Sequence, residues 1–119
     1  MSLRKQEEEF VEYEDGDGNM YTIVVGKNAQ NNWDIIDDAE QNDIWFHVEG
    51  QPSCHVIIQV DDNKTIPKRV INFAAALCKE NSKARFAKKA KIIYTQIKNV
   101  KKGTAVGSVK TSKTTQVIV

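Results

Sequence analysis

The sequence predicts a single α+β domain whose antiparallel-rich sheet is covered on one face by a long helix over residues 66–82. Short β-branched runs alternate with turn residues, and one segment has a clear helical periodicity. A length of 119 residues is enough for one domain with its own core. A shorter helix is expected at about 28–40. Residues 1–9 are expected to be a frayed acidic start, followed by the domain at 10–119.

The first elements are expected to be a hairpin and a short helix. Residues 10–14 alternate weakly, residues 20–25 are rich in β-branched side chains, and Asp15 to Asn19 between them supply turn chemistry. Gly26 interrupts the second run. Asn28 is then placed to cap a helix that is only partly apolar.

A second hairpin is expected from residues 44–48 and 54–60. If Val48 lies opposite Cys54, His47 faces His55 and Trp45 faces Ile57. The two histidines then share one face. The opposite, apolar face contains Ile44, Phe46, Val48, Cys54, Val56, Ile58 and Val60. A slip of one residue would exchange the two faces, so this register is a definite prediction.

The second helix has the strongest pattern in the chain. Its apolar residues recur at helical spacing and are Ile66, Val70, Phe73, Ala74, Leu77 and Cys78. Pro67 is expected in its first turn, where a missing N–H is harmless. A basic connector leads to an expected strand at 92–97. The Gly, Thr, Ser and Lys-rich residues 103–115 carry no predicted element, and a final strand is expected at 116–119.

The charges are distributed very unevenly along the chain. The formal net charge is only +1, yet residues 1–62 contain fifteen of the 16 acids and three bases, while residues 63–119 contain fourteen bases and one acid. Such a basic half favours a nucleic-acid partner, although a solvated face is the simpler alternative. The bases that stand without acids nearby in the sequence are Arg85, Lys88, Lys89, Lys91, Lys98, Lys101, Lys102, Lys110 and Lys113. Because most are lysines, we expect contacts to phosphates rather than base readout.

Few patterns in the chain are typical of catalysis, a cofactor or a metal. The sequence has no phosphate-binding G-x-x-x-x-G-K-[ST] loop and no C-x-x-C or H-x-x-x-H pair. We therefore expect no enzyme activity, no cofactor and no metal. Cys54 and Cys78 are expected to be reduced core residues of an intracellular, cytoplasmic protein. The longest apolar runs have about five or six residues, against the roughly 20 of a membrane span, so no membrane partner is expected.

The paired histidines allow three interpretations. His47 and His55 beside Trp45 could hydrogen-bond phosphates or bases or stack on them. They could instead lie between the sheet and a covering segment, where they would satisfy backbone groups. With a third ligand they could hold a metal ion.

Several blocks of residues resemble, in order and spacing, the NFACT-R domain. They are Gly26-Lys27-Asn28-Ala29-Gln30-Asn31-Asn32, Asp43-Ile44-Trp45-Phe46-His47-Val48, Pro52-Ser53-Cys54-His55-Val56 and Ile93-Tyr94-Thr95. The resemblance covers about residues 20–119, and the stand-alone form is similar to the coiled-coil domain-containing protein 25 branch. Two departures are Lys27 where arginine is usual and Ser53-Cys54 where Gly-Ser is typical.

The resemblance implies an RNA-binding module of ribosome quality-control factors, which engage the large ribosomal subunit and tRNA. Its motif residues Asn28, Asn32, Trp45, His47 and His55, together with Lys27 at the position of the usual arginine, are expected to form a polar patch. We therefore expect a non-catalytic module that contacts tRNA or ribosomal RNA mainly through phosphates. A protein-interaction adaptor that uses the acidic half and a DNA-binding module are the alternatives, and the oligomeric state is left open. The fold must bring Lys27 and the histidines next to bases from residues 85–113.

Overall fold

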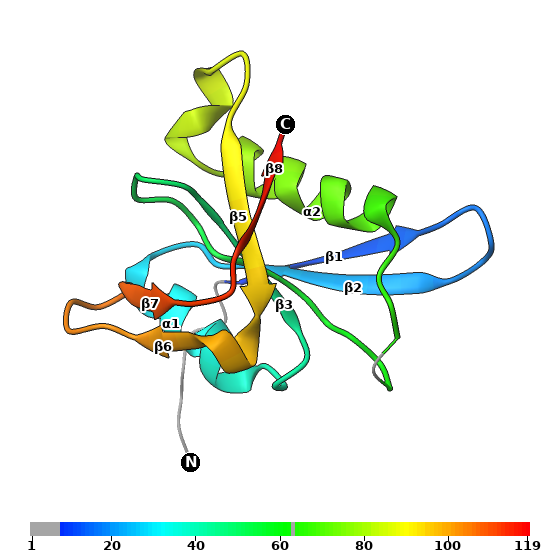
Figure 1. Ribbon diagram of the computed structural model, residues 1–119, viewed down its shortest axis with the longest axis horizontal. Coiled ribbons are helices and arrows are strands. Elements are labelled where there is room, and N and C mark those ends of the chain that lie inside the picture. Colours follow the sequence, from blue (N-terminus) through cyan, green and yellow to red (C-terminus); the bar gives the residue numbers. More distant parts are fainter. Residues whose placement is uncertain (1–7, 63) are drawn as a thin grey trace.

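The computed structural model describes residues 8–62 and 64–119, and its central feature is a six-stranded sheet (Figure 1). Every pair of neighbouring strands in the order β1-β2-β4-β3-β5-β8 is antiparallel, and β6 and β7 form a separate hairpin. The strands are β1 (Glu9–Glu14), β2 (Met20–Val25), β3 (Ile44–Val48), β4 (Val56–Ile58), β5 (Lys91–Gln96), β6 (Val100–Lys102), β7 (Val109–Thr111) and β8 (Thr115–Ile118). The helices are α1 (Ala29–Asp38), α2 (Lys68–Glu80) and the short 3-10 helices η1 (Lys83–Phe86) and η2 (Ile97–Asn99). No helix within these described residues is long and apolar enough to span a membrane.

The predicted register of the second hairpin is confirmed. Trp45 lies opposite Ile57 and Phe46 lies opposite Val56 in the antiparallel pair of β3 and β4. The first hairpin is also present, but β1 begins at Glu9, one residue inside the stretch expected to be frayed. Of the rest of that predicted frayed start, Glu8 belongs to no strand, and residues 1–7 lie outside the described residues.

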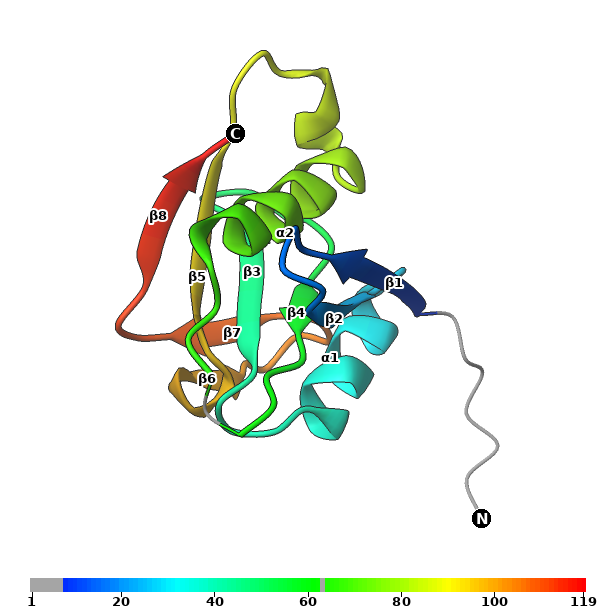
Figure 2. The same ribbon diagram turned by 90° about the vertical axis from the view of Figure 1, so that its right-hand side faces the viewer.

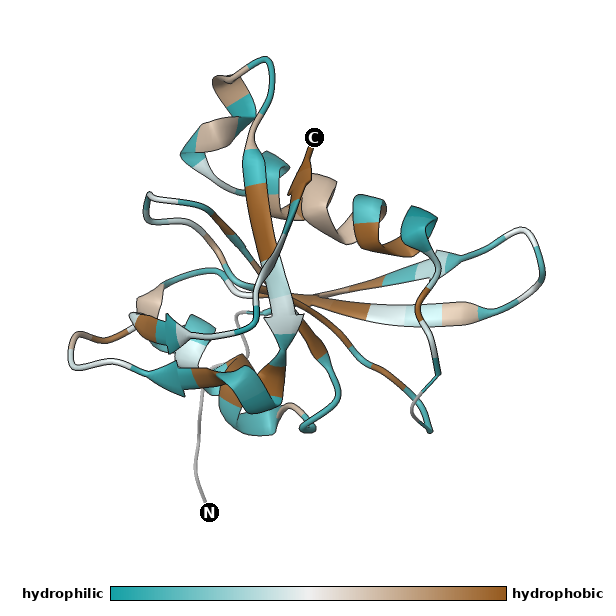
Figure 3. Cartoon of the chain, viewed as in Figure 1, coloured by the Kyte–Doolittle hydropathy of each residue, from teal (hydrophilic) through white to brown (hydrophobic). Residues whose placement is uncertain are grey.

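Helix α2 covers one face of the sheet, as the apolar periodicity predicts (Figure 2). Phe46, Val56 and Ile58 on this face are completely buried, and they pack with Val70 and Ala74 of the helix. The hydropathy colouring shows apolar residues concentrated in the central strands, while the loops are mostly hydrophilic (Figure 3). The regular helix is shorter than residues 66–82. Pro67 occupies its N-cap rather than its first turn.

The opposite face of the sheet is also covered, which the sequence does not predict. Helix α1 and the β6–β7 hairpin pack on it and form a second core cluster consisting of Val24, Ile35, Ile36, Trp45, Ile57, Ile97 and Val100. The hairpin includes β7 within residues 103–115, where no element was expected. The Trp33 indole N–H of α1 donates a hydrogen bond of 2.9 Å to the Ser108 carbonyl oxygen and so ties the hairpin to the helix.

Both cysteines are free thiols in or beside the core, as expected. Cys78 on α2 is buried, and Cys54 before β4 is half-buried. Each Sγ contacts the other residue's backbone carbonyl oxygen, at 3.5 Å for Cys54 and 3.6 Å for Cys78. These contacts join the start of β4 to the last turns of α2.

The burial of the sheet face beneath α2 can be tested by shortening a side chain on that face. Phe46→Ala should lower the free energy of unfolding by about 3–5 kcal/mol, because it leaves a cavity where a fully buried ring packs beside Tyr94. Urea denaturation measures this loss. Phe10→Ala is the matched control, since Phe10 is 57% exposed and should lose far less. Equal losses for the two variants would contradict the assignment of Phe46 to the core.

Candidate nucleic-acid interface

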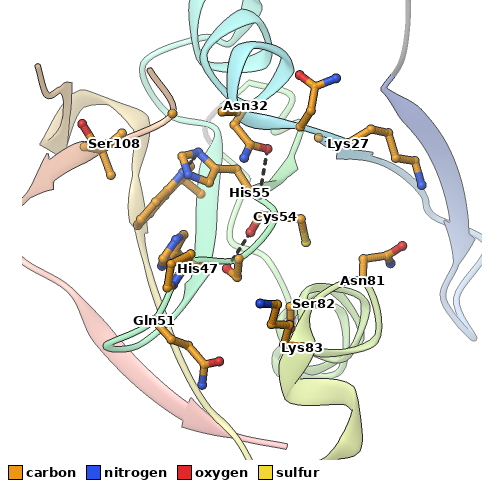
Figure 4. A pocket seen from close by; sticks show the side chains of 18 of the residues that line it. Lys27, Asn32, His47, Gln51, Cys54, His55, Asn81, Ser82, Lys83 and Ser108 are labelled. Atoms are coloured by element: carbon orange, nitrogen blue, oxygen red, sulfur yellow. Dashed lines mark hydrogen bonds between the residues drawn. The ribbon is translucent and has the colours of Figure 1, made fainter. Parts of the chain in front are cut away.

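An open cavity of about 910 Å³ lies where six separate parts of the chain meet (Figure 4). Its lining comes from residues 26–29 with Asn32, Trp45 and His47 of β3, the loop 50–55 before β4, residues 81–83 with Arg85, Ile93 of β5, and residues 106–109 with Thr111. Figure 4 shows Asn32, His55 and His47 along one side, while Lys27, Asn81 and Lys83 approach from the other. The fold therefore brings the histidines next to bases that lie far away in the sequence.

His55 is the buried centre of this site. Its side chain is 1% exposed, and its Nδ1 accepts a hydrogen bond of 3.1 Å from the Trp45 indole N–H. An Nδ1 that accepts cannot carry a proton, so the ring is neutral with its hydrogen on Nε2. The pKa of His55 is lowered to about 3, mainly by burial and also by nearby His47, while a hydrogen bond with the Gly107 backbone acts in the opposite direction.

Two glycines let the backbone pack tightly around His55. The amide N–H of Gly26 donates to the His55 carbonyl oxygen at 2.9 Å, and a Cβ on Gly26 would collide with the Asn32 side-chain oxygen. Gly107 adopts a φ of +88°, and its Cβ would lie 3.0 Å from Cα and Cβ of Ala29. Both positions therefore need glycine for close approach.

The predicted patch divides into supporting and cavity-facing residues. Asn32 is buried, and its Oδ1 accepts the His55 backbone N–H at 3.1 Å. Asn28 caps α1, because its Oδ1 accepts the Asn31 amide N–H at 2.8 Å. With the buried Trp45 and His55, these side chains maintain the shape of the cavity. This arrangement favours the structural interpretation for His55, which lies between the sheet and the β6–β7 turn.

His47 differs from His55 because it is only half-buried. Its ring stacks on Trp45 with centroids 5.5 Å apart and an interplanar angle of 8°, and it meets His55 edge-on at 5.2 Å. Burial lowers the pKa of His47, and a hydrogen bond with the Val48 backbone opposes the shift. A neutral imidazole that lines the cavity can accept one hydrogen bond and donate another.

Three bases line the cavity: Lys27, Lys83 and Arg85. Lys27 and Arg85 are among the residues that the sequence predicts to bind nucleic acid. Lys83 is not among them, because its position in the sequence is typical of the solvent-exposed flank of α2. The charge of Lys27 is partly offset by Glu9, whose carboxylate oxygen lies 3.6 Å from its Nζ. The backbone N–H of Lys27 donates to the Asn31 side-chain oxygen at 2.9 Å, which fixes the residue beside the N-terminus of α1.

The remaining predicted bases do not line the cavity but form two groups near opposite ends of β5. One group follows η1 and contains Lys88, Lys89 and Lys91; the other contains Lys98, Lys101, Lys102, Lys110 and Lys113. Six residues of extended strand separate the groups by about 17 Å. The cavity borders η1 on one side and the β6–β7 turn on the other, so it lies between the two groups.

Lys102 has no acid nearby in the sequence, but the fold gives it an acidic partner. Its Nζ lies 2.6 Å from a carboxylate oxygen of Asp37 on α1, and 5.5 Å from the ring centroid of Trp33. The packing of the β6–β7 hairpin against α1 creates this ion pair between the acidic and basic halves. Lys101 lies opposite Lys110 in the same hairpin, and both are exposed.

The arrangement offers polar and cationic groups rather than a metal centre. Within residues 8–62 and 64–119, no three His, Cys, Asp or Glu side chains are grouped so that they could hold a metal ion. The site combines a neutral floor of Trp45, His47 and His55 with cationic side chains at its margin. Such a surface can receive an anionic, partly aromatic ligand.

Comparisons with known proteins agree with the resemblance in the sequence. Residues 9–113 match the profile of the family described as NFACT protein RNA binding domain. The chain is 36% identical over 86 residues to coiled-coil domain-containing protein 25 of Mus musculus, a match that covers 69% of this chain and 41% of that protein. It is 37% identical over 84 residues to the Rqc2 homolog RqcH of Bacillus subtilis (strain 168), with 68% of this chain and 14% of that protein covered. The chain thus spans less than half the length of these relatives.

A solved structure shows the same fold. The C-terminal part of the fibronectin/fibrinogen-binding protein from Streptococcus suis superposes with a TM-score of 0.81 and 28% sequence identity. The match covers all of this chain and 47% of that one.

The protonation of His55 can be tested by its effect on stability. Folding lowers its pKa from the ordinary value of 6.5 to about 3, so below pH 6.5 the unfolded chain binds the proton more readily. The contribution is therefore fully present above pH 6.5 and is lost between pH 6.5 and 3, by up to about 1.4 kcal/mol per pH unit. Urea denaturation at several pH values measures this slope, and His55→Gln, which cannot titrate, should reduce it.

The tautomer provides an independent check on the same histidine. Nitrogen-detected NMR of the imidazole should show a neutral ring with its proton on Nε2 throughout the range from about pH 7 to about pH 5. A titration of His55 near its ordinary pKa would contradict the buried hydrogen bond from Trp45.

Proposed function

The chain belongs to the NFACT RNA-binding domain family, and on this premise we propose that it is a non-catalytic module that binds structured RNA, tRNA or ribosomal RNA, chiefly through phosphates. The observation that carries the proposal is the cavity, where a neutral aromatic and imidazole floor meets Lys27, Lys83 and Arg85. Two further groups of lysines extend this cationic surface. Residues 81–119 contain ten bases and no acid, so an anionic ligand meets no negative side chain from this stretch.

The size and chemistry of the cavity suit part of a nucleic acid. Pockets of about 300–1,000 Å³ enclose small-molecule ligands, so a cavity of about 910 Å³ has room for a nucleotide. Lysine acts as a flexible point charge on phosphate, whereas the half-buried His47 offers a fixed donor and acceptor. In this role His55, Asn32 and Trp45 support the site, and Lys27, His47, Lys83 and Arg85 contact the RNA.

The proposed setting is translation and ribosome quality control. It rests on the family and on the similarity to the Bacillus subtilis Rqc2 homolog. In that setting the partners are tRNA or ribosomal RNA on the large ribosomal subunit, and the place of action is the cytoplasm.

Reversing the charges at the cavity margin tests phosphate binding. The double variant Lys83→Glu and Arg85→Glu should weaken binding to tRNA and to ribosomal RNA fragments to a similar degree. It should also make the slope of log K against log salt shallower by roughly 0.7 to 0.9 for each phosphate that is no longer neutralised. Electrophoretic mobility measurements at several salt concentrations provide both quantities.

Lys68→Glu is the matched control for this experiment. Lys68 is an exposed base at the opposite end of α2, away from the cavity lining. Its reversal should change affinity only weakly through long-range charge. A flat salt response, or an equal loss for Lys68→Glu, would contradict the proposal. Tighter binding to DNA of the same sequence would instead support the DNA-binding alternative.

The two histidines should separate in a second experiment. His47→Ala should weaken RNA binding with little loss of stability, because this ring lines the cavity. His55→Ala should lower the free energy of unfolding by about 1–3 kcal/mol or more, because it leaves the buried Trp45 indole N–H without its acceptor. Urea denaturation and mobility shifts on both variants measure the difference. Unchanged RNA binding by folded His47→Ala would remove this residue from the interface.

A further inference from the structure

Phe86 is the most exposed large apolar side chain among the described residues, with 81% of its surface accessible. It lies at the end of η1, in the segment 83–91 that projects beyond the C-terminal end of α2 (Figure 1). A single exposed apolar residue on a surface is ordinary. The surroundings of this ring distinguish it from such a residue.

The segment 83–91 is anchored at both ends, so Phe86 is held outward. At its start the Ser82 side-chain oxygen accepts the Ala84 amide N–H at 3.3 Å, and its hydroxyl donates to the Lys79 carbonyl oxygen at 2.9 Å. At its end Ala90 exchanges two backbone hydrogen bonds with Val119, of 2.7 and 3.0 Å. The Lys79 Nζ also donates to the Lys88 carbonyl oxygen at 3.2 Å. Because the backbone of this segment is already ordered, little backbone conformational entropy is lost when a ligand packs on the ring.

Arg85 connects Phe86 with the cavity. Its guanidinium carbon lies 4.4 Å from the centroid of the Phe86 ring, and its NH1 donates to the Ser82 carbonyl oxygen at 3.0 Å. Arg85 also lines the cavity, so the ring and the cavity are adjoining parts of one surface. At 81% exposure, the ring keeps an open face beside this cation.

The positive charge of the side chains around Phe86 favours an anionic partner. Residues 83–91 contain five bases and no acid, and all five of their side chains are exposed. The other exposed phenylalanine, Phe10, lies instead beside Glu9 on the edge strand β1 in the acidic half. An aromatic ring among phosphate-binding cations is the combination that single-stranded nucleic acids use, since each base offers a face for stacking.

We propose that Phe86 is a stacking platform for an unpaired base of the bound RNA, with Arg85, Lys88 and Lys89 placed to hold the flanking phosphates. The proposal rests on the RNA-binding function and adds to it a preference for loops, bulges or ends over continuous duplex. A lipid surface fits less well, because stable interfacial binding needs a broad apolar face, and here one ring stands among lysines and small alanines.

The test compares an RNA hairpin carrying a single-stranded loop with a blunt RNA duplex of the same length. Phe86→Leu keeps an apolar side chain but removes the aromatic face, and Phe86→Trp restores one. Phe86→Leu should weaken binding to the hairpin by roughly fivefold or more and leave duplex binding nearly unchanged, while Phe86→Trp binds as the parent does. The salt slope should stay constant in Phe86→Leu, because the same phosphates are still neutralised. Phe10→Leu is the matched control and should have no effect.

The test distinguishes a failure of the stacking proposal from a failure of the RNA-binding function. If Phe86→Leu binds the hairpin like the parent while Lys83→Glu with Arg85→Glu weakens it, the stacking proposal is overturned and the RNA-binding function stands. If the parent protein binds neither RNA at low salt, both fail. If Phe86→Leu retains and Phe86→Ala loses binding to phosphatidylserine-containing vesicles, with no change for either RNA, the residue serves a lipid surface and the stacking proposal is also overturned.

Discussion

The hydrogen bond from the Trp45 indole to Nδ1 of His55 is the interaction on which the site depends. It joins β3 to the start of β4 within the layer between the sheet and the β6–β7 turn. Because it is buried, losing either partner leaves a polar group without compensation in a low-dielectric environment. The same bond orients the ring so that its other nitrogen lies toward the Gly107 backbone. In this tautomer the His55 ring therefore contacts both the sheet and the segment that covers it.

The neutrality of the two histidines has a consequence for the charged residues around them. A buried imidazolium would need a carboxylate partner, and a carboxylate in the cavity would repel an anionic ligand. Burial instead keeps His55 uncharged and lowers the pKa of His47. The positive charge then comes from side chains at the margin, which remain hydrated until a ligand arrives. The site can attract phosphate without burying an ion in the free protein.

The covered second face also explains where the cavity lies. Helix α1 and the β6–β7 hairpin close the sheet over Trp45 and Ile57, and their contact is fixed by the bond from Trp33 to Ser108. His47 near the end of β3 lines the cavity together with Asn81, which follows α2, and Gly107 of the β6–β7 turn. Elements from both sides of the sheet therefore meet at one end of its central strands, where side chains from distant parts of the sequence line the same space.

Local patterns in the sequence determined the elements whose energetics are local. The alternation of apolar residues along β3 and β4 was sufficient to predict the register and the pairing of His47 with His55, because a slip would expose a whole face. The apolar periodicity of α2 and the capping role of Asn28 could likewise be predicted from the sequence. The tertiary structure alone decided that residues 100–111 form the β6–β7 hairpin, that Lys102 pairs with Asp37, and that Lys83 and Arg85 reach the cavity. These outcomes depend on contacts between segments that are far apart in the chain. The free energy of such contacts cannot be predicted from a local pattern of residues.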